Sequence, residues 1–240
     1  MPPPASQRSA YWRGFRDGAP FALVVGPFGL VFGVVGAEAG LNLAEVMGFS
    51  ILVIAGASQI AAVQLMTENA PTVVVIVTAL AVNLRMAMYS VALVPYLGPA
   101  PRWQRGFIAY FLVDQAYAVA ATTYAREPEM PLGQRIAYFF GVVSPLCPLW
   151  YLCTLAGALL GGAIPPGFAL DFAVPITFLA LIAPLLRSLP HVIATLVSII
   201  ATLALAPLPY NTGLLVAAPL AMAAGAATEV LLTRTGRWRQ

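Results

Sequence analysis

Two charged side chains lie inside apolar stretches of this sequence. Arg85 is the single charged residue between Pro71 and Leu97, and Asp114 lies near the middle of the apolar stretch 107–125. A charge at bilayer depth costs roughly 2.5–3.5 kcal/mol on insertion scales. A chain that keeps two such charges uses them to neutralise each other or to hold a polar solute.

Other polar groups could complete a binding site around these charges. Residues three or four apart share a face of a helix, so Tyr89 would lie beside Arg85 and Tyr117 beside Asp114. A zwitterion would suit such a site, because arginine matches a carboxylate and aspartate matches an ammonium group. Apolar walls would then favour an apolar side chain. The substrate-binding residues that we predict are Arg85, Asn83, Ser58, Gln59, Tyr89, Asp114 and Tyr117.

Asp114 is also the candidate to carry a coupling proton. A carboxylate that leaves water holds its proton more firmly than a solvated one. The alternative is a structural ion pair, in which Arg85 and Asp114 only neutralise each other.

The composition predicts an all-α polytopic integral membrane protein. Hydrophobic residues make up 60% of the 240 residues and charged residues 9%, whereas soluble domains carry about 25% charged residues. A soluble core of this size could not hide so much apolar surface. We therefore predict one transmembrane domain over residues 1–240, with a short N-terminal tail at 1–17 and a C-terminal tail at 234–240.

Apolar segments recur along the whole chain, each long enough to cross a hydrocarbon core of about 30 Å. We count about eight, at 19–37, 43–66, 71–97, 107–125, 136–161, 170–186, 190–207 and 212–233. Segments one to three and five to seven share an outline, which hints at a parallel three-plus-one-plus-three repeat.

Glycine and proline interrupt several of these segments. Proline removes a helix hydrogen bond, and a freed carbonyl in lipid needs a partner or a water-filled cavity. Transporters build binding sites from such broken helices. We predict that Gly26, Pro27, Gly29 and Gly56 contribute backbone to an internal cavity, and that a break or re-entrant turn lies near Pro27 or Asn83. The alternative for Gly29 is close helix packing.

The distribution of arginine predicts the orientation. Arginines cluster near both termini, so both are expected in the cytoplasm. An even number of crossings follows, which agrees with eight. Eight simple crossings, however, place Arg102 and Arg105 outside, against the same rule.

Several motifs resemble those of the AzlC/YgaZ family of branched-chain amino-acid exporters. They are Phe15-Arg16-Asp17-Gly18-Ala19-Pro20-Phe21, the run from Gly26 to Gly33, Ala55-Gly56-Ala57-Ser58-Gln59, Asn83-Leu84-Arg85 with Tyr89, Pro95-Tyr96-Leu97 and Leu170-Asp171-Phe172-Ala173-Val174-Pro175. The resemblance extends from about Trp12 to Leu232. It departs at Met86, where members often carry histidine, and at Gln115, where they often carry glutamate.

The resemblance implies a permease of the bacterial cytoplasmic (inner) membrane that exports leucine, isoleucine, valine and methionine. It also implies a partner, a small hydrophobic membrane subunit of the AzlD/YgaH type. Both departures remove a titratable group, which leaves Asp114 as the candidate for proton coupling.

Two other classes of function compete with a secondary transporter. An accessory or structural membrane subunit would need Arg85 and Asp114 only as a neutral pair. An intramembrane enzyme would need His191 near a serine, or Asp114 near Asp171, and no nucleophile motif supports either. We therefore expect no catalytic residue. We also expect no metal and no cofactor, because the chain has one histidine and no Cys-x-x-Cys pair.

Overall fold

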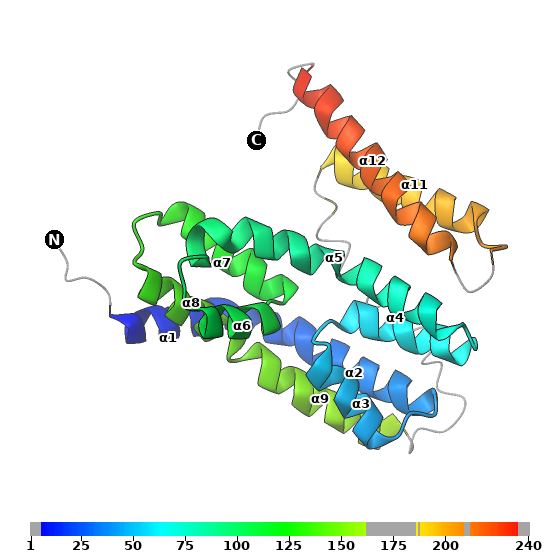
Figure 1. Ribbon diagram of the computed structural model, residues 1–240, viewed down its shortest axis with the longest axis horizontal. Helices are drawn as coiled ribbons and strands as arrows, with labels where there is room; N and C mark the ends of the chain where they lie inside the picture. Colours follow the sequence, from blue (N-terminus) through cyan, green and yellow to red (C-terminus); the bar gives the residue numbers. More distant parts are fainter. Residues whose placement is uncertain (1–5, 162–185, 187, 209–211, 235–240) are drawn as a thin grey trace. The chain divides into compact units, whose positions relative to one another are not determined.

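Figure 1 shows a computed structural model of the protein, which describes residues 6–161, 186, 188–208 and 212–234. All regular elements in these residues are helical. They are α1 (Gln7–Gly18), the short 3₁₀ helix η1 (Ala19–Phe21), α2 (Ala22–Glu38), α3 (Leu43–Leu52), α4 (Gly56–Thr67), α5 (Thr72–Leu97), α6 (Arg102–Tyr110), α7 (Asp114–Arg126), α8 (Leu132–Val143), α9 (Leu146–Gly161), α11 (Leu189–Ala204) and α12 (Gly213–Arg234). The predicted all-α membrane class is confirmed, and part of the predicted tail 1–17 forms α1.

Four helical stretches in the described residues are long and apolar enough to span a bilayer. They are Gln7–Glu38, Thr72–Leu97, Leu132–Gly161 and Gly213–Arg234. Two shorter apolar helices, α3 and α11, have 10 and 16 residues. The predicted segment 170–186 lies outside the described residues, except for Leu186. The count of eight segments therefore stays a prediction.

The chain forms two compact units. The first comprises Met1–Val63 and Val82–Phe168, and the second comprises Gln64–Ala81 and Ala169–Gln240. In the second unit α11 packs against α12. The single transporter domain that we predict over the whole chain stays a prediction.

Two long helical stretches form the core of the first unit through glycines that face each other's backbone. A Cβ atom at Gly33 would overlap the carbonyl oxygen of Thr154, and one at Gly157 would overlap that of Leu30. Each helix thus places a glycine against the backbone of the other, so α2 and α9 approach each other closely at this point. Small residues are what allow such an approach between membrane helices.

These two stretches, α1 to α2 and α8 to α9, run parallel (Figure 1). Gly14 meets the backbone of Tyr138 near the start of both stretches, and Gly33 meets Thr154 further along both. Parallel packing is the direction that the predicted repeat requires of its first and fifth segments. The repeat itself stays a prediction.

The helix breaks that we predicted near Pro27 and Asn83 are absent, whereas the second apolar segment is interrupted just before Gly56, where α4 begins. Helix α2 continues through Pro27, and α5 continues through Asn83. The backbone leaves the helical conformation at Val53, between α3 and α4, and is extended at Val113, between α6 and α7. Proline inside a membrane helix loses one hydrogen bond but need not end the helix, because neighbouring groups can satisfy the freed carbonyl.

Helices α5 and α7 run parallel, and α6 connects them in the opposite direction. Arg85 of α5 pairs with Asp114 at the start of α7, and the ring of Tyr96 lies 5.5 Å from that of Tyr124 near the ends of both helices. Consequently α6 begins, and α7 ends, at the same end of the first unit.

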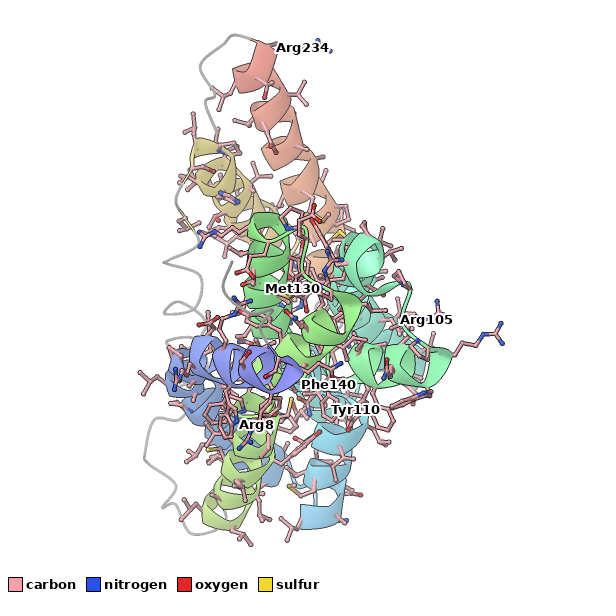
Figure 2. All side chains as sticks on the ribbon, turned by 90° about the vertical axis from the view of Figure 1, so that its left-hand side faces the viewer. Arg8, Arg105, Tyr110, Met130, Phe140 and Arg234 are labelled. Carbon is pink, nitrogen blue, oxygen red and sulfur yellow. The ribbon has the colours of Figure 1, made fainter. Side chains whose placement is uncertain are left out.

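The starts of α1 and α8 lie at this end too. Arg13 of α1 makes two hydrogen bonds of 2.9 Å to Glu127, the residue that follows α7. Arg135 of α8 donates to the main-chain oxygen of Tyr96 at 3.3 Å. Figure 2 is viewed from the left-hand side of Figure 1, with Arg8 of α1 and Arg105 of α6 labelled.

Candidate functional site

The structure brings the two charges of the apolar segments into contact. The Nη1 atom of Arg85 lies 3.2 Å from the Oδ2 atom of Asp114. Asp114 is the first residue of α7, whereas we had expected it in the middle of a helix. The free N–H groups and the dipole at a helix N-terminus favour a negative charge there. The Asp114 carboxylate is therefore stabilised by its contact with the guanidinium of Arg85 and by the dipole of α7.

The ion pair uses only part of the hydrogen-bonding capacity of its two members. Within the described residues, the Nε of Arg85 and the Oδ1 of Asp114 are buried and have no hydrogen-bond partner. The Oδ1 of Asn83 is in the same condition. A bidentate arginine–carboxylate pair would occupy both oxygens. This pair leaves at least one donor on Arg85 and one acceptor on Asp114 without a partner, and a ligand with a carboxylate and an ammonium group could use them.

Two tyrosines stack directly beside the pair. The rings of Tyr89 and Tyr117 lie 4.1 Å apart between centroids and are inclined by 10°. Tyr89 also interacts electrostatically with Arg85 and Asp114. Each tyrosine shares a helix face with its charged neighbour, because the two residues are three or four apart within α5 or α7. The two tyrosine rings can stack because α5 and α7 are parallel at this point.

The far ends of α5 and α7 are held together by Arg135 of α8, which our sequence analysis did not include among the site residues. The guanidinium of Arg135 lies 5.4 Å from the ring centre of Tyr96 and 6.0 Å from that of Tyr124. The Tyr124 hydroxyl donates to the main-chain oxygen of Arg135 at 2.7 Å. An arginine placed over aromatic rings contributes cation–π attraction, so Arg135 fixes α8 against both helices.

Ser58 and Gln59 are buried apart from the ion pair, and Gln59 belongs to a second polar cluster. Each is 1% exposed. The Gln59 side-chain amide donates to the Ser50 hydroxyl, and Ser50 donates to the Thr154 hydroxyl, both at 3.4 Å. The Ser58 hydroxyl donates to the main-chain oxygen of Ala55 at 2.9 Å. No hydrogen bond or ion pair within the described residues joins this cluster to the Arg85–Asp114 pair.

The glycines that we predicted around a cavity lie at helix contacts. A Cβ atom at Gly26 or Gly29 would meet Cys153 of α9, and one at Gly56 would meet Phe28 and Trp150. Pro27 lies within α2, between the first two glycines. The structure thus gives these positions a packing role, and their contribution to a cavity stays a prediction.

Two tyrosines that sequence reasoning missed connect the helix breaks. The Tyr110 hydroxyl, at the end of α6, donates to the main-chain oxygen of Ile51 at 2.6 Å and lies 3.1 Å from the Tyr151 hydroxyl. Ile51 lies two residues before Val53, the residue at which α3 ends. The end of α6 therefore contacts the end of α3, beside the break between α3 and α4. The only feature of the sequence that could have indicated this contact is the position of Tyr110 at the end of a short amphipathic helix.

Comparisons with known proteins identify relatives that are membrane proteins. The AzlC protein family model matches residues 20–164. The chain is 24% identical over 185 residues to the inner membrane protein YgaZ of Escherichia coli K12, which covers 75% of this chain and 74% of that protein. It is also 24% identical over 155 residues to an uncharacterized membrane protein of Helicobacter pylori J99, which covers 63% of this chain and 66% of the relative.

No solved structure matches the chain. The family model nevertheless covers more than half of the sequence and includes both Arg85 and Asp114. This protein is therefore a member of the AzlC family of membrane proteins.

Proposed function

We propose that this chain is the large subunit of a secondary transporter that exports branched-chain amino acids across the bacterial inner membrane. The observation that carries the proposal is the partly satisfied pair of Arg85 and Asp114, whose contact is 3.2 Å. Its unpaired donor and acceptor are complementary to the two charges of a free amino acid.

Binding would keep the site neutral. Without substrate, Arg85 and Asp114 neutralise each other, and an unpaired charge in the membrane is avoided. A zwitterion also has no net charge, so its carboxylate can face Arg85 while its ammonium group faces Asp114. The stacked rings of Tyr89 and Tyr117 would then offer an aromatic surface to the ammonium group or the aliphatic side chain.

Competition at Asp114 would couple export to the proton motive force. The ionised carboxylate holds the substrate's ammonium group, whereas the protonated carboxyl group has no charge to offer it. If a proton and a substrate cannot occupy the same carboxylate together, a proton that enters the cell can replace a substrate that leaves it. This is the requirement for coupled transport in opposite directions. Asp114 is thus the residue that we propose for proton coupling.

Both termini are cytoplasmic in this proposal: the helix directions in the first unit support this for the N-terminus, and the arginines near the C-terminus support it for that end. Because α6 begins at the end of the unit where α7 ends, these two helices form a re-entrant hairpin in this proposal. Arg102 and Arg105 then lie on the same side as Arg13 and Arg135. This removes the conflict with the positive-inside rule that eight simple crossings produced.

A small hydrophobic membrane subunit is part of the proposal. Family membership supports such a partner. Family membership also supports leucine, isoleucine, valine and methionine as the amino acids that the protein transports.

An accessory or structural role is the second candidate, and one observation favours it. Arg85 and Asp114 contact each other directly, as a purely neutralising pair would. An enzyme has less support. The Ser58 hydroxyl donates to a main-chain oxygen, and the serine that contacts His191 is Ser188, the N-cap residue of the same helix α11.

Transport in cells tests the proposal directly. A strain that lacks this chain should accumulate branched-chain amino acids. Co-expression of the chain with its small partner should relieve growth inhibition by a toxic leucine analogue. Export of all four amino acids that is unchanged by deletion and by co-expression would reject the function.

A further inference from the structure

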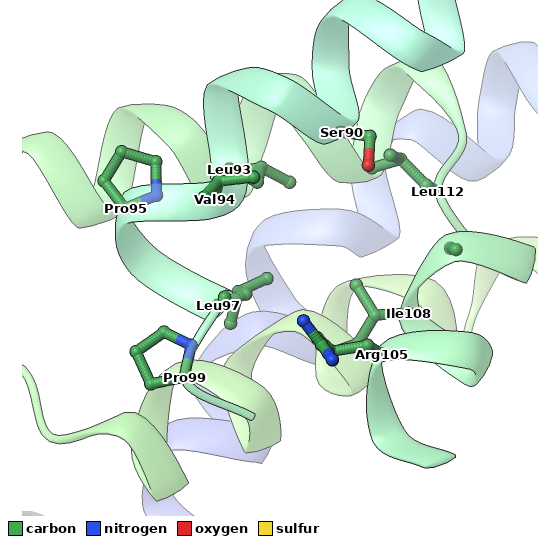
Figure 3. Close-up of a pocket in the computed structure, with 11 residues that line it drawn as sticks. Ser90, Leu93, Val94, Pro95, Leu97, Pro99, Arg105, Ile108 and Leu112 are labelled. Carbon is green, nitrogen blue, oxygen red and sulfur yellow. The ribbon is translucent and has the colours of Figure 1, made fainter. Parts of the chain in front are cut away.

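A pocket lies between the second half of α5 and the short helix α6, apart from the Arg85–Asp114 pair. Its volume is about 560 Å³, within the range of about 300–1,000 Å³ that small-molecule sites occupy. Buried aliphatic side chains form much of its wall, namely Leu93, Leu97, Ile108 and Leu112 (Figure 3). An aliphatic group would find an apolar surface there.

Arg105 is the charged residue in this lining. Its guanidinium points from α6 toward Leu97 and Pro99 (Figure 3). Within the described part of the chain Arg105 has no ion pair or hydrogen bond, whereas Arg13 and Arg135 each have partners. A pocket with aliphatic walls and one unpaired cation is complementary to an anion that carries an aliphatic group.

The pocket extends toward the ion pair. Ser90 and Leu112 line the end opposite to Pro99 (Figure 3). Ser90 follows Tyr89 in the sequence, and Leu112 lies two residues before Asp114. The inner end of the pocket is therefore beside the turn between α6 and α7, and Arg105 lies at the end of the unit that we assign to the cytoplasm.

We propose that Arg105 and this pocket form an outer subsite, which holds the carboxylate and the aliphatic side chain of an apolar amino acid before it reaches Arg85. The inference rests on the proposed export function and adds a second binding step to it. An exporter takes its substrate from the cytoplasm, so a subsite on that side raises the local substrate concentration next to the ion pair.

Arg102 provides a matched control. It has the same charge, lies one turn earlier on the same exposed helix, and is outside the pocket lining. The experiment compares Arg105→Gln, Arg102→Gln and Arg105→Lys in inside-out vesicles that also contain the partner subunit. Leucine transport is measured against the leucine concentration on the cytoplasmic face.

We expect Arg105→Gln to raise the leucine concentration for half-maximal transport about tenfold, the loss of one charge-assisted hydrogen bond. The maximal rate should stay unchanged, and Arg105→Lys should recover most of the affinity. Arg102→Gln should behave like the wild type. Equal effects of Arg105→Gln and Arg102→Gln would overturn the subsite, because they would reflect surface charge alone.

A lipid headgroup is the competing ligand, since an anionic phospholipid also combines an anion with aliphatic chains. Vesicles made with and without anionic phospholipid distinguish the two. An Arg105→Gln defect that appears only with anionic lipid would overturn the substrate subsite, whereas a defect of equal size in both supports it. Wild-type vesicles that transport no apolar amino acid would reject the proposed function itself, and the subsite with it.

Discussion

Asp114 begins helix α7, and its Oδ2 atom lies 3.2 Å from the Nη1 atom of Arg85 on the parallel helix α5. Asp114 is consequently stabilised by its position in the helix as well as by Arg85. The helix N-terminus already favours the negative charge of Asp114, so Arg85 does not have to be its only partner. A substrate carboxylate can therefore compete for Arg85 without leaving Asp114 wholly unstabilised.

Arg85→Lys tests whether this arginine binds substrate. Lysine keeps the charge but loses the planar fork that holds a carboxylate at two points. We expect the protein to insert and fold, and its specific transport activity to fall about tenfold to a hundredfold, the loss of one hydrogen bond between charged groups. Arg102→Lys, outside the pair, is the control and should leave the rate unchanged.

Asp114→Asn tests proton coupling. Asparagine keeps the shape of the side chain but removes both the charge and the titratable proton. Export against a concentration gradient should fail. Downhill exchange of labelled leucine for unlabelled leucine should persist only at higher leucine concentrations, because the asparagine oxygen still accepts a hydrogen bond from the ammonium group but offers it no charge. Proteoliposomes with and without an imposed pH gradient give both measurements. Uphill export at the wild-type rate would exclude Asp114 as the proton carrier.

A double substitution separates a binding pair from a neutralising pair. Either Arg85→Met or Asp114→Leu alone leaves one charge unpaired and should lower the folded yield. The two together remove both charges and should restore folding, as measured by size-exclusion chromatography in detergent. We expect this folded double variant to be inactive. Full transport by it would show that the pair serves only to neutralise charge.

Cysteine labelling tests the re-entrant hairpin of α6 and α7. In a variant without Cys147 and Cys153, a membrane-impermeant reagent is applied to each side in turn. Ser9→Cys in α1 and Gly106→Cys in α6 should react from the same side, and Ala39→Cys after α2 from the opposite side. Gly106 has open space around it, so the new side chain fits. Labelling of Gly106→Cys together with Ala39→Cys would reject the hairpin.

Gly157→Ala tests the close parallel packing of α2 and α9. The new Cβ atom would overlap the backbone of Leu30, and overpacking typically costs about 1–3 kcal/mol. Gly48→Ala in α3 is the matched control, because its Cβ atom would meet nothing within 4 Å. We expect thermal unfolding in detergent to shift to lower temperature for Gly157→Ala only. A stable Gly157→Ala variant would contradict the observed approach of the two helices.

The sequence by itself determined the class of the protein and its unusual charges. Apolar composition is a sum over residues and does not depend on how the helices are arranged, so 60% hydrophobic residues were enough to predict a helical membrane protein. The cost of a buried charge is equally independent of the fold. That cost singled out Arg85 and Asp114, and the structure places them in contact.

Only the tertiary structure decided where the helices break and which polar groups share a site. The break before Asp114 consists of Phe111-Leu112-Val113, which contains no glycine or proline and offers no local signal. Contacts between residues far apart in the chain hold it instead, such as the hydrogen bond from Tyr110 to Ile51. Ser58 and Gln59 bond to groups other than the ion pair for the same reason: the partner of a buried polar group is chosen by packing, which a pattern along one segment does not encode.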